Sequence, residues 1–233
     1  MIDSKRQTSW LRRFVPVLAQ RFWLKCLGTP AFTFVFFLAY IHLLKNPYRP
    51  VTVMPTGVLD DLISFQPLAL LPYVSLWLYV SLPPTFMVRS REIVLYGIWA
   101  AVLCLSGLAI FFLWPTAVPP ANIDWAQYPG VDFLKGVDAA GNACPSLHVA
   151  TAVFSGVWLH HILRAFGTGR RGLLLNWLWC AAIVYSTMAT KQHVAIDVVA
   201  GIALGGGVAW LSLIRRDGFT VLARPQALTT QSV

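Results

Sequence analysis

Residues 193–214 read HVAIDVVAGIALGGGVAWLSLI, an apolar stretch with a single acidic residue, Asp197, near its beginning. A helix needs roughly 20 apolar residues to cross the hydrocarbon core of a bilayer, and this stretch is long enough to do so. A charge in the hydrocarbon layer costs at least about 2.5–3.5 kcal/mol, so an acid kept there needs a partner or a function. The stretch therefore predicts a membrane-spanning helix with a polar site at one end.

The rest of the chain has the same character. Of its 233 residues, 57% are hydrophobic and only 12% are charged, and the mean hydropathy is +0.64, which is typical of a membrane protein. We predict an all-α bundle of six membrane-spanning helices: Cys26–Leu44, Leu62–Leu82, Ile93–Trp114, Ser146–Phe166, Leu173–Thr190 and His193–Ile214. They form one domain, 26–216, between a basic N-terminal segment, 1–25, and a tail, 217–233.

The formal net charge of +9 comes from basic residues whose distribution along the chain matches this topology. All the basic residues fall on the side of the N-terminus except Lys45, Arg49, Lys135 and Lys191. By the positive-inside rule both termini are then cytoplasmic, and the charge indicates contact with membrane lipids and not with nucleic acid. Residues 10–25 mix aromatic side chains with cations, which fits either an interfacial amphipathic helix or a disordered basic tail.

A histidine precedes the intramembrane acid by one helical turn. His193 and Asp197 are four residues apart, so on a helix both side chains face the same way. The carboxylate of Asp197 can hold one imidazole nitrogen of His193, fix the tautomer and leave the other nitrogen basic. The pair predicts either a catalytic histidine with its orienting acid or a buried structural pair.

A second polar cluster, Pro145-Ser146-Leu147-His148, opens the fourth predicted helix. Ser146 is a capping residue, and the amides at a helix start can bind an anion such as phosphate. Alternatively, Ser146 only caps the helix. The topology places this cluster and the His193 cluster on the outer face of the membrane. His160 and His161 lie about 18 Å further along the same helix and, like His42, are expected to be interfacial or packing histidines.

The cysteine spacing gives no sign of a metal site or a redox motif. The four cysteines lack the paired spacing of a metal or redox motif, and we expect Cys144 to be a free thiol with a packing role. We predict no metal and no cofactor. The alternative is a metal hydrolase in which His148, His193 and Asp197 form a facial triad.

The two clusters resemble two motifs of the type 2 phosphatidic acid phosphatase superfamily, whose members share a six-helix core. Its Pro-Ser-Gly-His motif is similar to residues 145–148, and its Ser-Arg-x5-His-x3-Asp motif is similar to Ser186-Thr187, His193 and Asp197 with the same spacing. The resemblance covers roughly residues 93–214. It implies a phosphohistidine mechanism in which His193 attacks phosphorus, Asp197 orients it, and His148 acts as general acid and base.

The sequence departs from the family at three places. Leu147 replaces the glycine, Thr187 replaces the arginine, and residues 114–120 lack the cations of the Lys-x6-Arg-Pro motif. These departures resemble the branch that includes inositol phosphorylceramide synthases. Ser146 and the Leu147 amide are expected to bind phosphate. We also expect Lys191, or else Lys135, to supply the missing cation, with an interfacial lysine as the alternative for Lys191.

The resemblance implies a lipid phosphatase in a bacterial inner membrane, acting on a lipid phosphate at the periplasmic face. A lipid phosphotransferase with the same histidine chemistry is the first alternative. A non-enzymatic transporter or lipid scaffold, in which His193 and Asp197 relay ions, is the second, although transporters more often place polar groups near the membrane midplane.

Overall fold

The structure is a computed structural model that describes residue 17, residues 19–130 and residues 141–214. Most of the predicted N-terminal segment, the whole tail 217–233 and Lys135 lie outside the described residues. Their predicted roles as amphipathic segment, cytoplasmic tail and alternative phosphate cation stay predictions.

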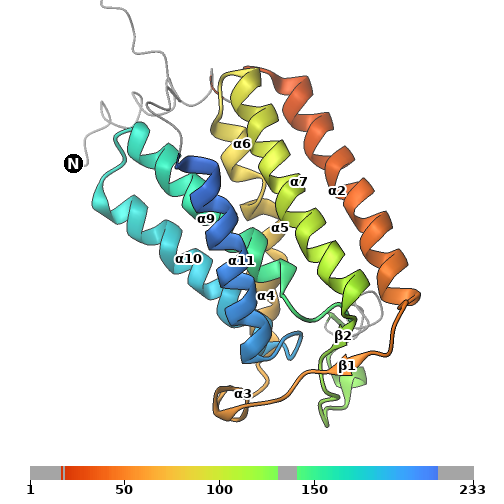
Figure 1. Cartoon of the computed structure of the whole chain (residues 1–233). Helices are drawn as coiled ribbons and strands as arrows, with labels where there is room; N and C mark the ends of the chain where they lie inside the picture. Colours follow the sequence, from red (N-terminus) through yellow and green to blue (C-terminus); the bar gives the residue numbers. More distant parts are fainter. Residues whose placement is uncertain (1–16, 18, 131–140, 215–233) are drawn as a thin grey trace, which may run out of the picture.

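Five long helices run side by side along one axis (Figure 1): α2 Phe22–Lys45, α7 Ser90–Leu113, α9 Leu147–Ala165, α10 Arg170–Ala189 and α11 Ala195–Leu213. In the part of the chain that is described, α2, α7, α10 and α11 are long and apolar enough to cross a membrane. The prediction of a mostly helical, membrane-spanning fold is confirmed to that extent. The count of six spans stays a prediction, since α9 and the second predicted helix are outside this set.

The second predicted helix is a series of short helices instead of one continuous helix. After α3 (Val58–Leu62), the chain forms η1 (Pro67–Ala69), α4 (Leu70–Val74), α5 (Leu76–Tyr79) and α6 (Leu82–Phe86). Prolines explain the breaks, because proline lacks the amide hydrogen and its ring clashes with the preceding turn. They stand at positions 67, 72, 83 and 84. The segment still runs from one end of the bundle to the other (Figure 1).

A two-stranded parallel sheet, absent from the sequence prediction, joins the loops at the lower end of Figure 1. Strand β1 (Thr52–Val53) follows α2, and β2 (Thr116–Ala117) follows α7 and precedes η2 (Trp125–Gln127). The hydroxyl of Thr116 accepts a hydrogen bond from the Cys144 amide at 2.8 Å. The sheet therefore anchors the segment that leads into α9.

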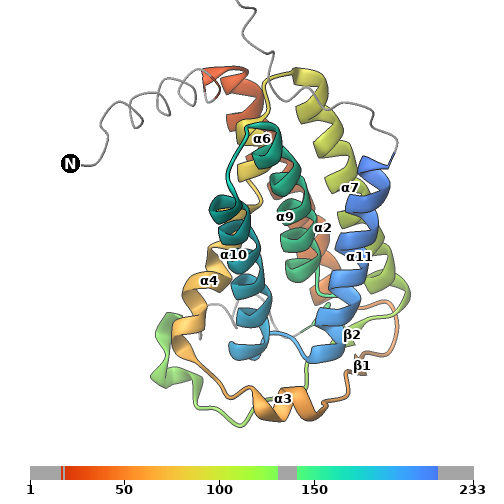
Figure 2. The ribbon, with the colours of Figure 1, turned by 90° about the vertical axis from the view of Figure 1, so that its left-hand side faces the viewer.

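Helix α9 is the centre of the bundle and packs against α7, α10 and α11 (Figure 2). Its large side chains Phe154 and Trp158 are each 1% exposed, and the Trp158 indole donates to the Ser212 hydroxyl of α11 at 3.0 Å. Helix α11 approaches closely through Gly201 and Gly205. A Cβ on Gly201 would lie 2.6 Å from the Ser146 carbonyl oxygen, so only glycine permits this contact.

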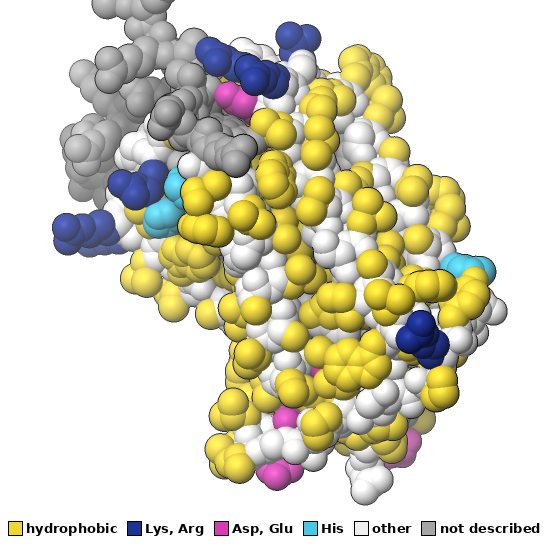
Figure 3. Space-filling view, viewed as in Figure 1, with side chains coloured by type: hydrophobic (Ala, Val, Ile, Leu, Met, Phe, Trp, Pro, Cys, Tyr) yellow, Lys and Arg dark blue, Asp and Glu magenta, His cyan; other side chains and the backbone are white. Residues whose placement is uncertain are grey.

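The chemical character of the bundle surface changes along the same axis. Figure 3 shows apolar side chains over the flank, Lys and Arg mainly at the upper end, and Asp and Glu mainly at the lower end. A broad apolar flank fits lipid contact. The division agrees with the positive-inside rule, with the upper end cytoplasmic, but the orientation of the termini stays a prediction.

Candidate active site

The loop between α10 and α11 presents His193. The amides of Gln192 and His193 both donate to the Thr187 carbonyl, at 2.9 and 3.0 Å, which fixes the turn that ends α10. Lys191, in the same turn, has a left-handed backbone with φ of 55°. The His193 ring therefore stands just before the first turn of α11.

Asp197 lies in that first turn and is fully buried. Its Oδ2 atom lies 3.5 Å from His193 Nδ1 and accepts a hydrogen bond from the Val194 amide at 3.1 Å. The histidine is only 8% exposed. At 3.5 Å the two side chains interact electrostatically at a distance longer than an ordinary hydrogen bond. The carboxylate thus caps α11 and faces the imidazole at the same time.

Ser146 joins the cluster at residues 145–148 to the cluster of His193 and Asp197. The Ser146 amide donates to the Asp197 carbonyl at 3.1 Å, and the Ser146 hydroxyl accepts from the Val149 amide at 3.2 Å. The predicted cap at the start of α9 is confirmed, and so is the prediction that both clusters lie at the same end of the bundle. Helix α9 therefore begins next to Asp197.

His148 is held by α4. Its Nε2 atom lies 3.1 Å from the Tyr73 carbonyl oxygen, and the imidazole stacks on the Tyr73 ring with centroids 4.0 Å apart and planes 19° from parallel. A carbonyl oxygen only accepts hydrogen bonds, so Nε2 carries the proton. The Nδ1 atom is then the nitrogen through which His148 can exchange a proton with a substrate.

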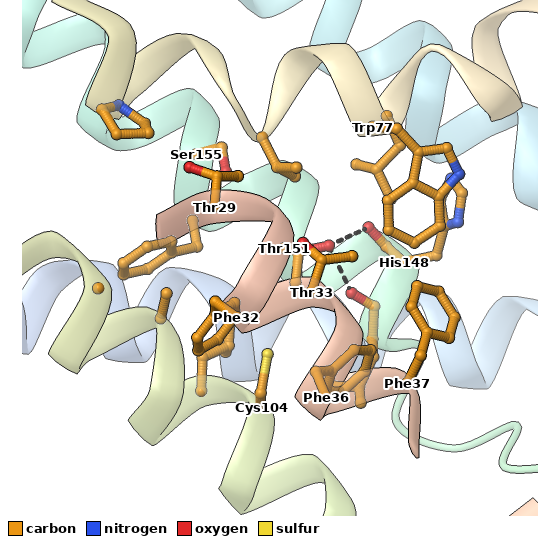
Figure 4. A pocket seen from close by; sticks show the side chains of 18 of the residues that line it. Thr29, Phe32, Thr33, Phe36, Phe37, Trp77, Cys104, His148, Thr151 and Ser155 are labelled. Atoms are coloured by element: carbon orange, nitrogen blue, oxygen red, sulfur yellow. Dashed lines mark hydrogen bonds between the residues drawn. The ribbon is translucent and has the colours of Figure 1, made fainter. Parts of the chain in front are cut away.

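A cavity of about 560 Å³ connects the two histidines to the interior of the bundle. Both His148 and His193 line it, together with residues from α2, α4, α5, α7 and α9. Figure 4 shows His148 between Trp77 and Thr151, opposite the aromatic side chains of α2. The volume is in the range of ordinary ligand sites.

Lys191, predicted to bind phosphate, has other partners here. Its ammonium donates to the carbonyl oxygens of Asp60 and Ile63, at 3.0 and 2.6 Å. The Asp60 carboxylate in turn accepts from the Ala195 amide at 2.8 Å. Lys191 therefore anchors α3 and the residue after it to the turn between α10 and α11, and Asp60 joins α3 to the start of α11. Phosphate binding by Lys191 stays a prediction.

Thr187 stands where the family motif has arginine. Its hydroxyl donates to the Val184 carbonyl of the same helix at 2.8 Å, and the residue is fully buried. The side chain is thus used within α10, which agrees with the expectation that a phosphate cation is missing at this position.

Three residues of the site were missed or underrated by the sequence analysis. Tyr73 holds His148 and has no signature in the sequence. Asp60 caps α3 through the Gly57 amide, and the Gly-x-x-Asp spacing was a readable capping signal. Cys144 is buried beside Asp197. Burial and the nearby carboxylate raise the pKa of its thiol to about 11.

The other histidines have separate partners. His160 accepts from the Trp177 indole at 3.1 Å near the far end of α9, and His42 pairs with the Tyr48 hydroxyl at 3.2 Å. Their prediction as packing or interfacial residues agrees with these contacts. Over residues 19–130 and 141–214, no three His, Cys, Asp or Glu side chains are grouped so that they could hold a metal ion.

The fold and the site define a class: an integral membrane protein with two histidines and a buried aspartate where an apolar cavity meets one end of a helical bundle. The family comparison gives the same result, because residues 92–219, more than half of the chain, match the PAP2 superfamily. The chain belongs to the PAP2 superfamily, which indicates phosphatase-type chemistry on phosphate esters. No curated protein and no solved structure matches it.

Proposed function

We propose that the chain is a lipid phosphatase that acts through a phosphohistidine on His193, in a bacterial inner membrane with the site on the periplasmic side. The observation that carries the proposal is that His193 and His148 line one apolar cavity. A lipid phosphate fits such a site, because its phosphate needs the histidines and its chain needs apolar walls.

In this mechanism Asp197 holds the Nδ1 proton of His193, so that Nε2 presents its lone pair to phosphorus. The Nε2–P bond forms as the bond between phosphorus and the lipid oxygen breaks. His148, protonated on Nδ1 as well as on Nε2, gives that oxygen its Nδ1 proton, and the alcohol leaves. Water then attacks the phosphohistidine while His148 takes its proton, and phosphate departs. Positioning and charge stabilisation are most of what such a transfer needs.

We assign the phosphate oxygens to the start of α9. This helix has 19 residues, and its first amides and dipole favour an anion. The Leu147 amide binds an equatorial oxygen in this scheme. Ser146 fixes the helix end through its contact with the Val149 amide and keeps the Leu147 amide in place.

A lipid phosphotransferase is the second candidate, and a specific observation favours it. No Lys or Arg is among the described residues that line the cavity, and Thr187 stands where the family motif has arginine, so the site offers less of the positive charge that a phosphomonoester dianion favours. A phosphodiester carries one negative charge less. With a diester donor, the hydroxyl of a second lipid would replace water in the second step.

Product analysis separates the two candidates. Purified protein in liposomes is given a lipid phosphomonoester, or a phosphodiester with an acceptor lipid, and lipids and inorganic phosphate are measured by mass spectrometry and colorimetry. Phosphate release, absent in His193→Asn, supports the phosphatase. A new headgroup lipid without phosphate release supports the transferase. If His193→Asn matches the wild type in both reactions, the phosphohistidine mechanism is wrong.

A further inference from the structure

We infer that the cavity holds one hydrocarbon chain of the lipid substrate, and that Gly28 of α2 and Gly97 of α7 determine how long a chain it accepts. This inference rests on the proposed function, because it concerns the substrate of the same site. Both glycines line the cavity with His148 and His193.

The cavity is deep. On α2 its lining runs from Tyr40, at the level where Asn142 donates to the Tyr40 carbonyl at 3.1 Å, down to Gly28 and Leu24. Gly28 and Tyr40 are twelve residues apart, which is about 18 Å along a helix. The histidines lie at the end where α9 begins, and the glycines lie toward the opposite end. A phosphate at the histidines would therefore place an attached chain along α2.

The walls suit a hydrocarbon chain. The lining residues, all within the described part of the chain, include no Asp, Glu, Lys or Arg. Phe32, Phe36 and Leu103 are among the apolar ones. The hydroxyls along α9 are already used, since Ser155 pairs with the Tyr96 hydroxyl at 3.1 Å and Thr151 donates to the Leu147 carbonyl at 2.8 Å. A polar ligand would gain few new hydrogen bonds here.

The two glycines leave room at the deep end. A Cβ atom on Gly97 would meet no heavy atom within 4 Å, and one on Gly28 would meet only the Leu24 side chain, at 4.0 Å. Since α2 and α7 pack against each other, side chains at these two positions would occupy space that a chain terminus would otherwise fill. The terminal carbons of a long chain are the part that a larger residue would exclude.

The test compares Gly97→Leu with Gly207→Leu as the matched control. Gly207 also lies within an apolar helix with nothing within 4 Å of a built Cβ, but it is outside the cavity lining. The kcat/KM ratio of octadecyl phosphate to decyl phosphate is measured in mixed micelles for both variants and the wild type. Each buried methylene is worth roughly fourfold in binding, so losing contact with two or three of them should lower the ratio by more than about tenfold. Gly207→Leu should keep the wild-type ratio.

Binding is measured separately so that failure of the inference and failure of the proposed function can be distinguished. Octadecyl and decyl phosphonates have a carbon–phosphorus bond that cannot be hydrolysed as an ester, and their dissociation constants are determined by titration calorimetry for the same three proteins. A selective loss of octadecylphosphonate affinity in Gly97→Leu supports the chain site even if no phosphatase activity is found. Equal ratios in all three proteins, in turnover and in binding, would overturn the inference while leaving a measured phosphatase activity intact.

Discussion

The Nδ1 atom of His193 lies 3.5 Å from Oδ2 of Asp197, and the same carboxylate oxygen accepts from the Val194 amide that opens α11. The orientation of the imidazole is therefore tied to the cap of the helix. In the proposed mechanism this arrangement keeps the proton on Nδ1 and leaves Nε2 as the nucleophile.

Replacing Asp197 with asparagine tests this relationship. The asparagine oxygen can still accept from the Val194 amide, so the helix cap is kept, but the negative charge that holds the imidazole is lost. We expect kcat to fall by a factor on the order of 10³–10⁴, measured with a soluble aryl phosphate. The thermal midpoint in detergent should change little. A decrease of less than about tenfold would make Asp197 a structural residue only.

Lys191→Met distinguishes an anchor from a phosphate ligand. The ammonium holds the carbonyls of Asp60 and Ile63, and a hydrogen bond from a charged group contributes about 1.5–3 kcal/mol. An anchoring role alone predicts lower thermal stability and an unchanged inhibition constant for vanadate, whereas the phosphate binding expected from the sequence predicts weaker inhibition; exposed Lys45→Met is the control lysine. Weaker vanadate inhibition with unchanged stability would instead assign Lys191 to the phosphate.

Gly205→Ala should separate α9 from α11. A Cβ on Gly205 would lie against the backbone of Ala150, whereas one on the neighbouring Gly206 would meet only the Val153 side chain at 4.0 Å. Overpacking of this kind costs about 1–3 kcal/mol. We expect Gly205→Ala to lower both the thermal midpoint and kcat, since the helix contact brings Asp197 to Ser146. The Gly206→Ala protein should behave as the wild type, and equal behaviour of both variants would contradict the packing argument.

The pH dependence of Cys144 follows from its raised pKa. With a pKa of about 11 in place of the usual 9, the thiol stays protonated until the solution is strongly alkaline. Iodoacetamide reacts with the thiolate, so labelling of Cys144 in the folded protein at pH near 8 should be far slower than labelling of the same cysteine after the protein is unfolded in denaturant. Mass spectrometry of the peptides measures both rates. Comparable rates at this pH would show that the thiol is not held in its protonated form.

The sequence predicted the site better than it predicted the helices around it. Ser146 caps a helix as expected, whereas His193, expected inside the last helix, lies two residues before α11 and still faces Asp197. Segment 62–82 was expected to be a single span interrupted by Pro67 and Pro72, and the structure divides it into several short helices. There, the local preference of proline prevailed over the apolar composition on which the span was predicted.

Contacts between segments that are distant in the chain could not be predicted from the sequence. The Tyr73 carbonyl that holds His148 is 75 residues away from it, and the Asp60 carboxylate that caps α11 is 135 residues from Ala195. Their partners are set by how α3 and α4 pack against the bundle, and periodicity carries no information on that packing. The cavity depends in the same way on the spacing of α2 and α7.

The central claim, that His193 is the nucleophile and His148 the general acid and base, is tested most directly by the burst of alcohol from an activated aryl phosphate. A phenolate of low pKa leaves without protonation, so His148→Ala should still form the phosphoenzyme and release one equivalent of phenol in a burst. The phosphoenzyme should then accumulate, because no base activates water. His193→Asn should show neither burst nor phosphoenzyme. A burst in His193→Asn and none in His148→Ala would show that the two roles are exchanged.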